Sequence, residues 1–553
     1  MRRARNLFIR SETARPQCSV ELLTLAASLF FALFCNRLFL EGMLAGYTWA
    51  QPAAWWYGLC LLVVLTAAHF VLFGLVMTRW TVKPLLGLLF VVTAFAVHFM
   101  TRYKVFLDTN MVRNVLATNP GEAGDLLTWS LLPQLALYAV LPLWLMSRYT
   151  LVRRPWGRAV LVRLGWLAAA LVIGLGAVFA NFQDFASSMR NTRELRFLVT
   201  PANYLYSLGQ VIRNEQPGVE KPREPIGLDA VAGPGWAKRD KPVVMVMVLG
   251  ETVRAANWGL SGYARQTTPE LAAEGGVINF AQVSSCGTDT ETSVPCLFSP
   301  WGRRQYDEKK IRGSESLLDV LARAGFRVVW IDNQAGCKGV CKGVEATRPD
   351  PALSPKWCIN GDCQDGALVD RLKPLMAETP GNLLVVMHQM GNHGPAYFKR
   401  YPDEFRQFTP ACEDADLPRC SAESIVNAYD NAIRYTDHVL VATIQQLRSS
   451  KTHEVGLLYV SDHGESLGEK GLYLHCVPYS IAPEVQTRVP MVVWLGEGFA
   501  RLMGVDTACL ARQAAQPLSH DHLFHSLLGL LDVKTALYVP EMDFTAACRR
   551  ATP

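Results

Sequence analysis

A run of hydroxyl side chains between Cys286 and Cys296 carries the clearest sign of chemistry in this chain. A hydroxyl becomes a nucleophile when a neighbouring base or metal ion lowers its pKa. A hydroxyl at the start of a helix also lets backbone N–H groups receive a phosphate oxygen. Residue types alone leave several nucleophiles open, namely Thr288, Thr290, Thr292 and Ser293.

Acidic and imidazole side chains stand at the ends of three predicted strands. Sites in open α/β sheets form beyond the carboxyl ends of the strands. The strands and the residues that follow them are 243–249 with Glu251, 383–387 with His388 and His393, and 455–460 with Asp462 and His463. Two carboxylates and one imidazole suit Zn²⁺. We therefore predict a zinc site formed by Glu251, Asp462 and His463. Lys338 adds positive charge for a phosphate or for charge that develops in the transition state.

Short apolar runs alternate with helical patterns after residue 241. Continuous runs rich in β-branched residues are typical of buried parallel strands. The alternation predicts an α/β sheet with helices on both faces. The predicted strands are 243–249, 327–331, 383–387, 455–460 and 491–495, and the predicted helices are 314–324, 368–377 and 425–447.

The first third of the chain is far more apolar than the rest. Five segments approach the ~20 residues that cross a bilayer core, and they are 20–40, 55–77, 84–100, 127–146 and 161–180. Arginines precede the first segment and follow the second and fourth, which predicts a cytoplasmic N-terminus and an outward C-terminal domain. Much of the net charge of +6 comes from these arginines, so we predict no nucleic-acid binding.

The distribution of apolar and polar residues predicts that the chain has three parts. Residues 1–181 are predicted to form a transmembrane domain with five spans, and 241–553 a catalytic domain outside the cytoplasm. Residues 182–240 connect them. Within the connector, 193–213 mixes arginines with large apolar residues, as helices on membrane surfaces do, and 216–241 is a linker rich in Pro and Gly.

Eleven of the fourteen cysteines lie after residue 285, several of them in close pairs within polar loops. No Cys-x-x-Cys knuckle of a zinc ribbon occurs among these pairs. We predict disulfides, which also indicate an oxidising compartment. The predicted pairs are Cys286–Cys296, Cys337–Cys341, Cys358–Cys363 and Cys412–Cys420, whereas Cys476, Cys509 and Cys548 receive no assignment.

Longer motifs surround these residues, and together they resemble a known family. They are Gly250-Glu251-Thr252-Val253-Arg254-Ala255-Ala256-Asn257, Ser285-Cys286-Gly287-Thr288 through Val294-Pro295-Cys296, Cys337-Lys338-Gly339-Val340-Cys341, His388-Gln389-Met390-Gly391-Asn392-His393-Gly394-Pro395, and Ser461-Asp462-His463-Gly464-Glu465-Ser466-Leu467-Gly468-Glu469 with Leu474-His475. The set resembles the phosphoethanolamine transferases that modify lipid A, including the mobile colistin-resistance enzymes. These are membrane-bound members of the alkaline phosphatase superfamily. The resemblance spans nearly the whole chain and implies five transmembrane helices followed by a sulfatase-like α/β domain with a mostly parallel sheet.

The resemblance assigns roles residue by residue. It implies that Thr290 is the nucleophile and completes the shell of one catalytic zinc held by Glu251, Asp462 and His463. It places His393 and His475 against the phosphoryl group or a second zinc. Lys338 matches a lysine on the substrate side, and Asn114 and Glu122 match the region that receives the donor head group.

The implied reaction has two displacement steps. Thr290 takes phosphoethanolamine from phosphatidylethanolamine, and a lipid A phosphate then takes it from Thr290, while His393 or His475 protonates the leaving oxygen. The added amine offsets surface charge and weakens binding of polymyxin and other cationic peptides. The resemblance further implies a monomer among the lipids of a Gram-negative inner membrane, with its catalytic domain in the periplasm.

Other readings stay open at this point. The acceptor could be a core sugar, Kdo or a periplasmic glucan, and a membrane-tethered phosphatase or sulfatase has a similar architecture. The arginine of the usual sulfatase run is missing after Val294-Pro295-Cys296-Leu297, which disfavours a sulfatase. Asp289 and Glu291 flank Thr290, and we expect both of them to point to solvent.

Overall fold

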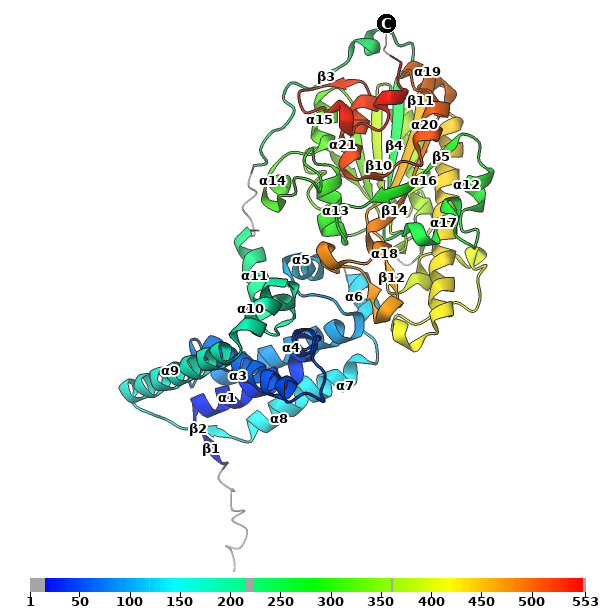
Figure 1. The fold of residues 1–553 in the computed structure, drawn as a ribbon. Helices are drawn as coiled ribbons and strands as arrows, with labels where there is room; N and C mark the ends of the chain where they lie inside the picture. Colours follow the sequence, from blue (N-terminus) through cyan, green and yellow to red (C-terminus); the bar gives the residue numbers. More distant parts are fainter. Residues whose placement is uncertain (1–14, 119, 192, 215–221, 360–361, 551–553) are drawn as a thin grey trace, which may run out of the picture. The chain divides into compact units, whose positions relative to one another are not determined.

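The computed structural model describes residues 15–550 except 119, 192, 215–221 and 360–361 (Figure 1). The chain divides into two compact units. The first unit runs to Arg102 and adds Phe106–Val112 and Trp129–Asn214. The second unit consists of Tyr103–Val105, Arg113–Thr128 and the chain from Glu215 onward. The predicted connector is therefore split, because its helices up to Asn214 belong to the first unit.

Three helices of the first unit are long and apolar enough to cross a membrane. They are α3 (Pro52–Gly74), α4 (Val82–Tyr103) and α9 (Trp156–Ala180), with 23, 22 and 25 residues. Each exceeds the ~20 residues that a bilayer core requires. They correspond to the second, third and fifth predicted spans.

The first and fourth predicted spans are interrupted. A π-helical stretch, Phe31–Cys35, ends α1 (Val20–Phe30), and the chain bends by 63° before α2 (Arg37–Met43). At the bend, Asn36 Nδ2 donates to the carbonyls of Phe31 and Thr200 at 2.9 and 2.7 Å. The fourth segment is Leu131–Ser147, an apolar helix below spanning length that consists of α7 (Leu131–Leu135), a π-helical turn and α8 (Leu141–Ser147). By length and composition the described residues thus contain three spans, or four if the bent pair counts as one.

The predicted surface helix over 193–213 is also broken. The chain forms α10 (Phe182–Asn191), a 3₁₀ stretch at Arg193–Leu198 and then α11 (Ala202–Asn214). Pro201, which has no backbone N–H to donate, lies in the interruption. The prediction of one helix over 193–213 from the amphipathic pattern is therefore wrong.

The second unit is built on an eight-stranded sheet. The strands are β4 (Val243–Gly250), β5 (Val277–Ser284), β6 (Arg327–Asp332), β7 (Glu345–Thr347), β10 (Leu383–His388), β11 (Glu454–Ser461), β14 (Arg488–Leu495) and β15 (Leu518–Ser519), in the order β15-β5-β14-β11-β4-β10-β6-β7. β14 runs antiparallel to both of its neighbours, β5 and β11. The other five pairings are parallel. The sheet is therefore mixed, and the expectation that 491–495 forms a parallel strand is wrong.

The central strands are buried on both faces because helices cover both. Alternate residues of β4 enter opposite cores, Met245 and Met247 on one side and Val246 and Val248 on the other. Figure 1 shows α15 (Leu317–Arg323) and α21 (Asp521–Leu530) on one side of the sheet, and α12 (Pro269–Ala273) and α17 (Ala422–Arg448) on the other. α16 (Gly366–Glu378) joins the side of α17. The three predicted helices correspond to α15, α16 and α17.

The register brings the carboxyl ends of the central strands level. Gly250 at the end of β4 pairs with Ser461 at the end of β11, and Leu249 pairs with His388 at the end of β10. Residues just beyond these ends therefore lie side by side.

Disulfides close several loops of the second unit. All four predicted pairs are present, and Cys509 and Cys548 form a fifth disulfide. The Cys286–Cys296 bond closes the hydroxyl-rich run onto α13 (Thr290–Leu297).

Trp330 tests the packing of this sheet. Its side chain is fully buried in β6, in edge contact with Phe298. Trp330→Ala should lower the free energy of unfolding by about 3–5 kcal/mol, because the cavity cannot collapse fully. Chemical denaturation measures the loss. The exposed Leu353 is the control, and its replacement by Ala should cost less than about 0.5 kcal/mol; equal losses in the two variants would contradict the described core.

Candidate active site

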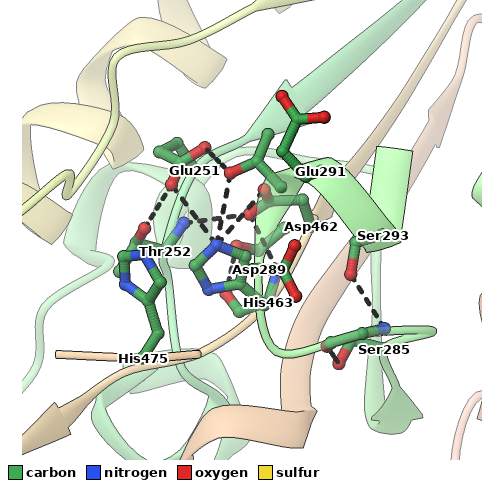
Figure 2. Close-up of polar contacts among 12 residues, drawn as sticks. Glu251, Thr252, Ser285, Asp289, Glu291, Ser293, Asp462, His463 and His475 are labelled. Carbon is green, nitrogen blue, oxygen red and sulfur yellow. Dashed lines mark hydrogen bonds and ion pairs between the residues drawn. The ribbon is translucent and has the colours of Figure 1, made fainter. Parts of the chain in front are cut away.

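Glu251, Asp462 and His463 meet at the carboxyl ends of β4 and β11 (Figure 2). All three are fully buried, and each offers a ligand atom within 4.8 Å of the others. His463 Nε2 lies 3.5 Å from Glu251 Oε1 and 3.5 Å from Asp462 Oδ2. The three residues that the sequence placed after strand ends therefore lie together in the structure.

The backbone fixes which atoms face the centre. His463 Nδ1 donates to the carbonyl of Gly464 at 2.9 Å, so Nε2 faces the carboxylates. Asp462 Oδ1 accepts from the N–H groups of Thr252 and His463 at 3.1 and 2.7 Å. Thr252 adopts a left-handed φ of 60° to make this turn. Asp462 Oδ2 is buried and accepts no hydrogen bond.

The electrostatics of the cluster favour a cation. Burial and the charge of Glu251 raise the pKa of Asp462 to about 7. Burial opposes the charge on His463, yet Asp462 and Glu251 outweigh it and raise the pKa of His463 to about 10. Two crowded carboxylates, an unused oxygen and a correctly oriented imidazole fit a divalent ion such as Zn²⁺. Among the described residues one other candidate group exists, Cys286, Cys296 and Asp521, but its sulfur atoms form a disulfide.

Thr290 is the hydroxyl of the run that lies against this cluster. It is the first residue of α13, and its Oγ1 donates to Glu251 Oε2 at 3.1 Å and lies 3.4 Å from His463 Nε2. The other hydroxyls make different contacts. Thr288 donates to the carbonyl of Val477, Thr292 donates to Asp289, and Ser293 accepts from the N–H of Gly287. Geometry thus singles out the residue that the resemblance selected.

Asp289 and Glu291 are both buried, at 7% and 3% exposure, so the expectation that they point to solvent is wrong. Asp289 is the N-cap of α13 and accepts from the N–H of Thr292 at 2.9 Å. Glu291 lies 2.9 Å from Arg312 Nη2 and 3.3 Å from Lys338 Nζ. Burial raises the pKa of Glu291, but the charges of Lys338 and Arg312 outweigh it, and the pKa is lowered. One carboxylate caps the helix and the other binds the predicted lysine.

His393 and His475 lie close to the cluster but outside the metal-binding group found among the described residues. The His475 ring is 4.4 Å from the His463 ring and 6.4 Å from that of His393. His475 Nδ1 lies 3.1 Å from Glu465 Oε2. Burial and the charge of His463 lower the pKa of His475 to about 3, so this imidazole is neutral near pH 7.

Of the two residues expected to receive the head group, the structure describes the side chain of Asn114 but not that of Glu122. Asn114 belongs to the second unit, and its Nδ2 lies 3.8 Å from Cys476 Sγ, beside His475. Glu122 falls in α6 (Pro120–Leu126), but its side chain lies outside the described residues. His388 ends β10, where its Nδ1 lies 2.8 Å from Asp332 Oδ1.

Two residues that support Glu251 were not predicted from the sequence. Gln334 Nε2 donates to Glu251 Oε2, and Gln334 follows β6, so the strand-end rule could have found it. Gly391 has φ +49°, and a Cβ there would lie 2.7 Å from the backbone oxygen of Glu251. Only the structure reveals this close approach of two backbones.

Family models match both units. Residues 65–216 match the model described as phosphoethanolamine transferase EptA/EptB, and 244–533 match the sulfatase model. The chain is 34% identical over 548 residues to phosphoethanolamine transferase EptA of Escherichia coli K12, covering 97% of this chain and 98% of that one. The chain belongs to the phosphoethanolamine transferase family.

Two further members of the family are similar to this chain over nearly its whole length. Phosphatidylethanolamine transferase Mcr-1 of Escherichia coli is 36% identical over 531 residues, covering 94% of this chain and 96% of that one. The solved integral membrane lipooligosaccharide phosphoethanolamine transferase A of Neisseria meningitidis superposes with a TM-score of 0.90 at 35% identity, covering 97% of this chain and all of that one. This phosphoethanolamine transferase is thus a membrane protein with a soluble, sulfatase-like C-terminal domain.

Glu291 gives a test of the charges in this transferase. Removing its charge leaves Lys338 and Arg312 without a buried partner, so Glu291→Gln should cost on the order of 3 kcal/mol at neutral pH. Because the folded pKa of Glu291 is lowered, its contribution is present above the unfolded value and is lost as pH falls through the folded one. Denaturation at several pH values should show the two proteins converging toward acid. The same change at Glu345, which pairs with Arg327 at the surface, should cost less than about 1 kcal/mol; a pH-independent gap for Glu291→Gln would contradict the assignment.

Proposed function

We propose that this chain transfers phosphoethanolamine from phosphatidylethanolamine to a lipid A phosphate through a phosphoethanolamine-threonine at Thr290. The observation that carries the proposal is the Thr290 hydroxyl, 3.1 Å from Glu251 Oε2 and next to a buried cluster of metal-ligand type. The names of the relatives supply the transferred group and the donor class.

Glu251, Asp462 and His463 would hold one catalytic Zn²⁺, with Thr290 as the fourth ligand. The fit rests on Asp462 Oδ2, which accepts no hydrogen bond, and on the His463 tautomer. Bound there, the ion would lower the pKa of the Thr290 hydroxyl and offset negative charge in the transition state. A second zinc at His393 and His475 with substrate remains part of the proposal.

The first displacement forms a bond between Thr290 Oγ1 and the phosphorus of the donor. Thr290 begins α13, so the helix start would face the attacked phosphoryl oxygens with its partial positive charge. The hydroxyl already donates to Glu251 Oε2, which is in place to receive its proton. The bond from phosphorus to the diacylglycerol oxygen breaks, and that oxygen takes up a proton.

His393 is the better candidate for the acid that protonates the leaving oxygen. Burial is the main cause that keeps His475 neutral, and an imidazole that stays unprotonated at neutral pH is a poor general acid. His475 is then suited to bind the phosphoryl group or a cation. In the second displacement an acceptor oxygen attacks the phosphorus, and Thr290 Oγ1 leaves and regains a proton.

Lys338, Asn114 and Glu122 would contact the donor. Lys338 is near the nucleophile through its ion pair with Glu291, and Asn114 reaches the neighbour of His475. Both contacts support a role for these side chains on the approach to the phosphoryl group.

The proposed organisation follows the sequence pattern: five spans in 1–181, a connector at 182–240 and a catalytic domain at 241–553. The five disulfides support an oxidising compartment, the periplasm beside a Gram-negative inner membrane. The protein would act as a monomer among the membrane lipids. The added amine would lower the negative charge of the cell surface and reduce binding of polymyxin.

The relatives favour a lipid A phosphate over Kdo as acceptor. The Kdo(2)-lipid A phosphoethanolamine 7″-transferase of Escherichia coli is 26% identical to this chain, below the 34–36% of EptA and Mcr-1 from that species. Mass spectrometry of lipid A from cells with and without the protein separates these acceptors. A phosphoethanolamine found on Kdo alone would overturn this part of the proposal.

Thr290 tests the proposed reaction. Thr290→Ala should abolish the phosphoethanolamine adduct and slow transfer by at least about 1,000-fold, because no other hydroxyl of the run faces the cluster. Intact-protein and peptide mass spectrometry after incubation with phosphatidylethanolamine detect the adduct. Thr290→Ser should restore it. Thr292→Val removes a hydroxyl from the same helix and should keep the adduct, so an active Thr290→Ala protein would rule out this nucleophile.

Metal content tests the cluster separately. The purified full-length protein should carry one zinc per chain, measured by inductively coupled plasma mass spectrometry. Asp462→Asn should weaken zinc binding by at least about 10-fold, because it removes the anionic oxygen that has no other partner. Glu469→Gln changes a half-exposed carboxylate of the same motif that pairs with Arg254 and should keep the zinc. Equal zinc in both variants would exclude this site.

A further inference from the structure

Asp125 connects α6 to the loop that carries His393. Asp125 Oδ2 lies 3.2 Å from Arg400 Nη2, and Asp125 Oδ1 lies 2.5 Å from Lys399 Nζ. The side chains of Asp125 and Arg400 are each 10% exposed, whereas that of Lys399 is 53% exposed. All of these residues belong to the second unit. The pair with Arg400 is thus the shielded one, and water and salt screen the pair with Lys399.

Arg400 carries the contact onward to a predicted site residue. Its Nε donates to the carbonyl oxygen of His393 at 2.7 Å. The guanidinium therefore holds a carboxylate with one edge and the backbone of His393 with another. This use of a planar, rigid donor set is specific to arginine, since lysine presents a single point charge.

The loop between these residues is fastened at a second place. A 3₁₀ turn, Tyr397–Lys399, precedes Arg400, and the Tyr397 hydroxyl donates to Glu465 Oε1 at 3.1 Å. Glu465 in turn contacts His475. The loop is therefore fixed on one side by a buried carboxylate of the site and on the other by Asp125.

We propose that Asp125 and Arg400 are positioning residues for the transfer reaction: α6 must be seated against Arg400 for His393 to keep its place at the phosphoryl group. This role rests on the proposed function. Neutralising Asp125 removes the shielded ion pair that orients the Arg400 guanidinium, which weakens its hold on the His393 carbonyl.

Other contacts of the same chain segment agree with this role. Arg113 Nη2 lies 2.8 Å from Glu308 Oε1, and Asn114 contacts Cys476 next to His475. The segment Arg113–Thr128 thus reaches neighbours of both imidazoles, and Asn114 is the residue proposed to receive the donor. Seating of this segment would couple arrival of the donor to alignment of His393.

The test uses the full-length, zinc-loaded protein in vesicles that contain phosphatidylethanolamine. Asp125→Asn and Arg400→Lys should each slow formation of the Thr290 adduct by about 10- to 100-fold, as loss of a supporting contact does. The fall should appear mainly in kcat, with zinc content unchanged and the protein still folded at the assay temperature, although loss of the shielded pair lowers its unfolding temperature. Lys399→Gln is the matched control, because it removes the exposed partner of the same carboxylate, and its rate should stay within about 2-fold.

Two further measurements separate positioning from general stability. Amide hydrogen exchange over 393–400 without substrate should be faster in Asp125→Asn and Arg400→Lys than in the wild type or the control. The double variant should be no slower than the slower single one, because both changes break one contact chain. Wild-type rates in the single variants, or losses explained by lost zinc or by unfolding at the assay temperature, would overturn the positioning role. A wild-type chain that transfers no phosphoethanolamine would instead overturn the proposed function together with this role.

Discussion

The burial of two neighbouring carboxylates, Glu251 and Asp462, is the constraint on which the second unit depends. Ionised carboxylates are costly to bury without counter-charge, and these two stand at the ends of adjacent strands in fixed register. His463 compensates for only part of their charge, and one oxygen of Asp462 has no hydrogen bond. A divalent cation would supply the rest, so metal binding and the order of these strand ends would be coupled.

The hydroxyl beside this cluster is fixed by contacts that are independent of one another. Asp289 caps the first turn of α13, the Cys286–Cys296 disulfide closes the loop before it, and the whole helix is buried. Thr290 therefore meets Glu251 without a flexible approach. Rigid support of this kind holds a nucleophile within the small tolerance that displacement at phosphorus requires. Thr290 reaches the cluster from the loop after β5, whereas Glu251, Asp462 and His463 follow β4 and β11.

The sequence revealed the parts of the site that depend on local pattern. Continuous apolar strands can be recognised from the sequence, so the site residues that follow them, including Glu251, were predicted. β5 was missed because polar residues interrupt its apolar run and the exposed Ala281 and Gln282 break its alternation. The direction of β14 cannot be read from its sequence, because an apolar run looks alike in either direction. The burial of Glu291 depends on Lys338 and Arg312, which are distant in sequence. Likewise the bend at Asn36, which interrupts a predicted span, depends on Thr200.

Polar contacts join Arg113–Thr128 to the rest of the second unit. The residues on either side of this segment, Phe106–Val112 and Trp129–Asn214, belong to the first unit. The segment is therefore covalently bound to one unit and packed in the other. The Asp125–Arg400 pair is shielded from solvent, so breaking it is costly and it fixes where the segment lies. In the proposed reaction this seat would keep His393 aligned while diacylglycerol leaves and the acceptor enters.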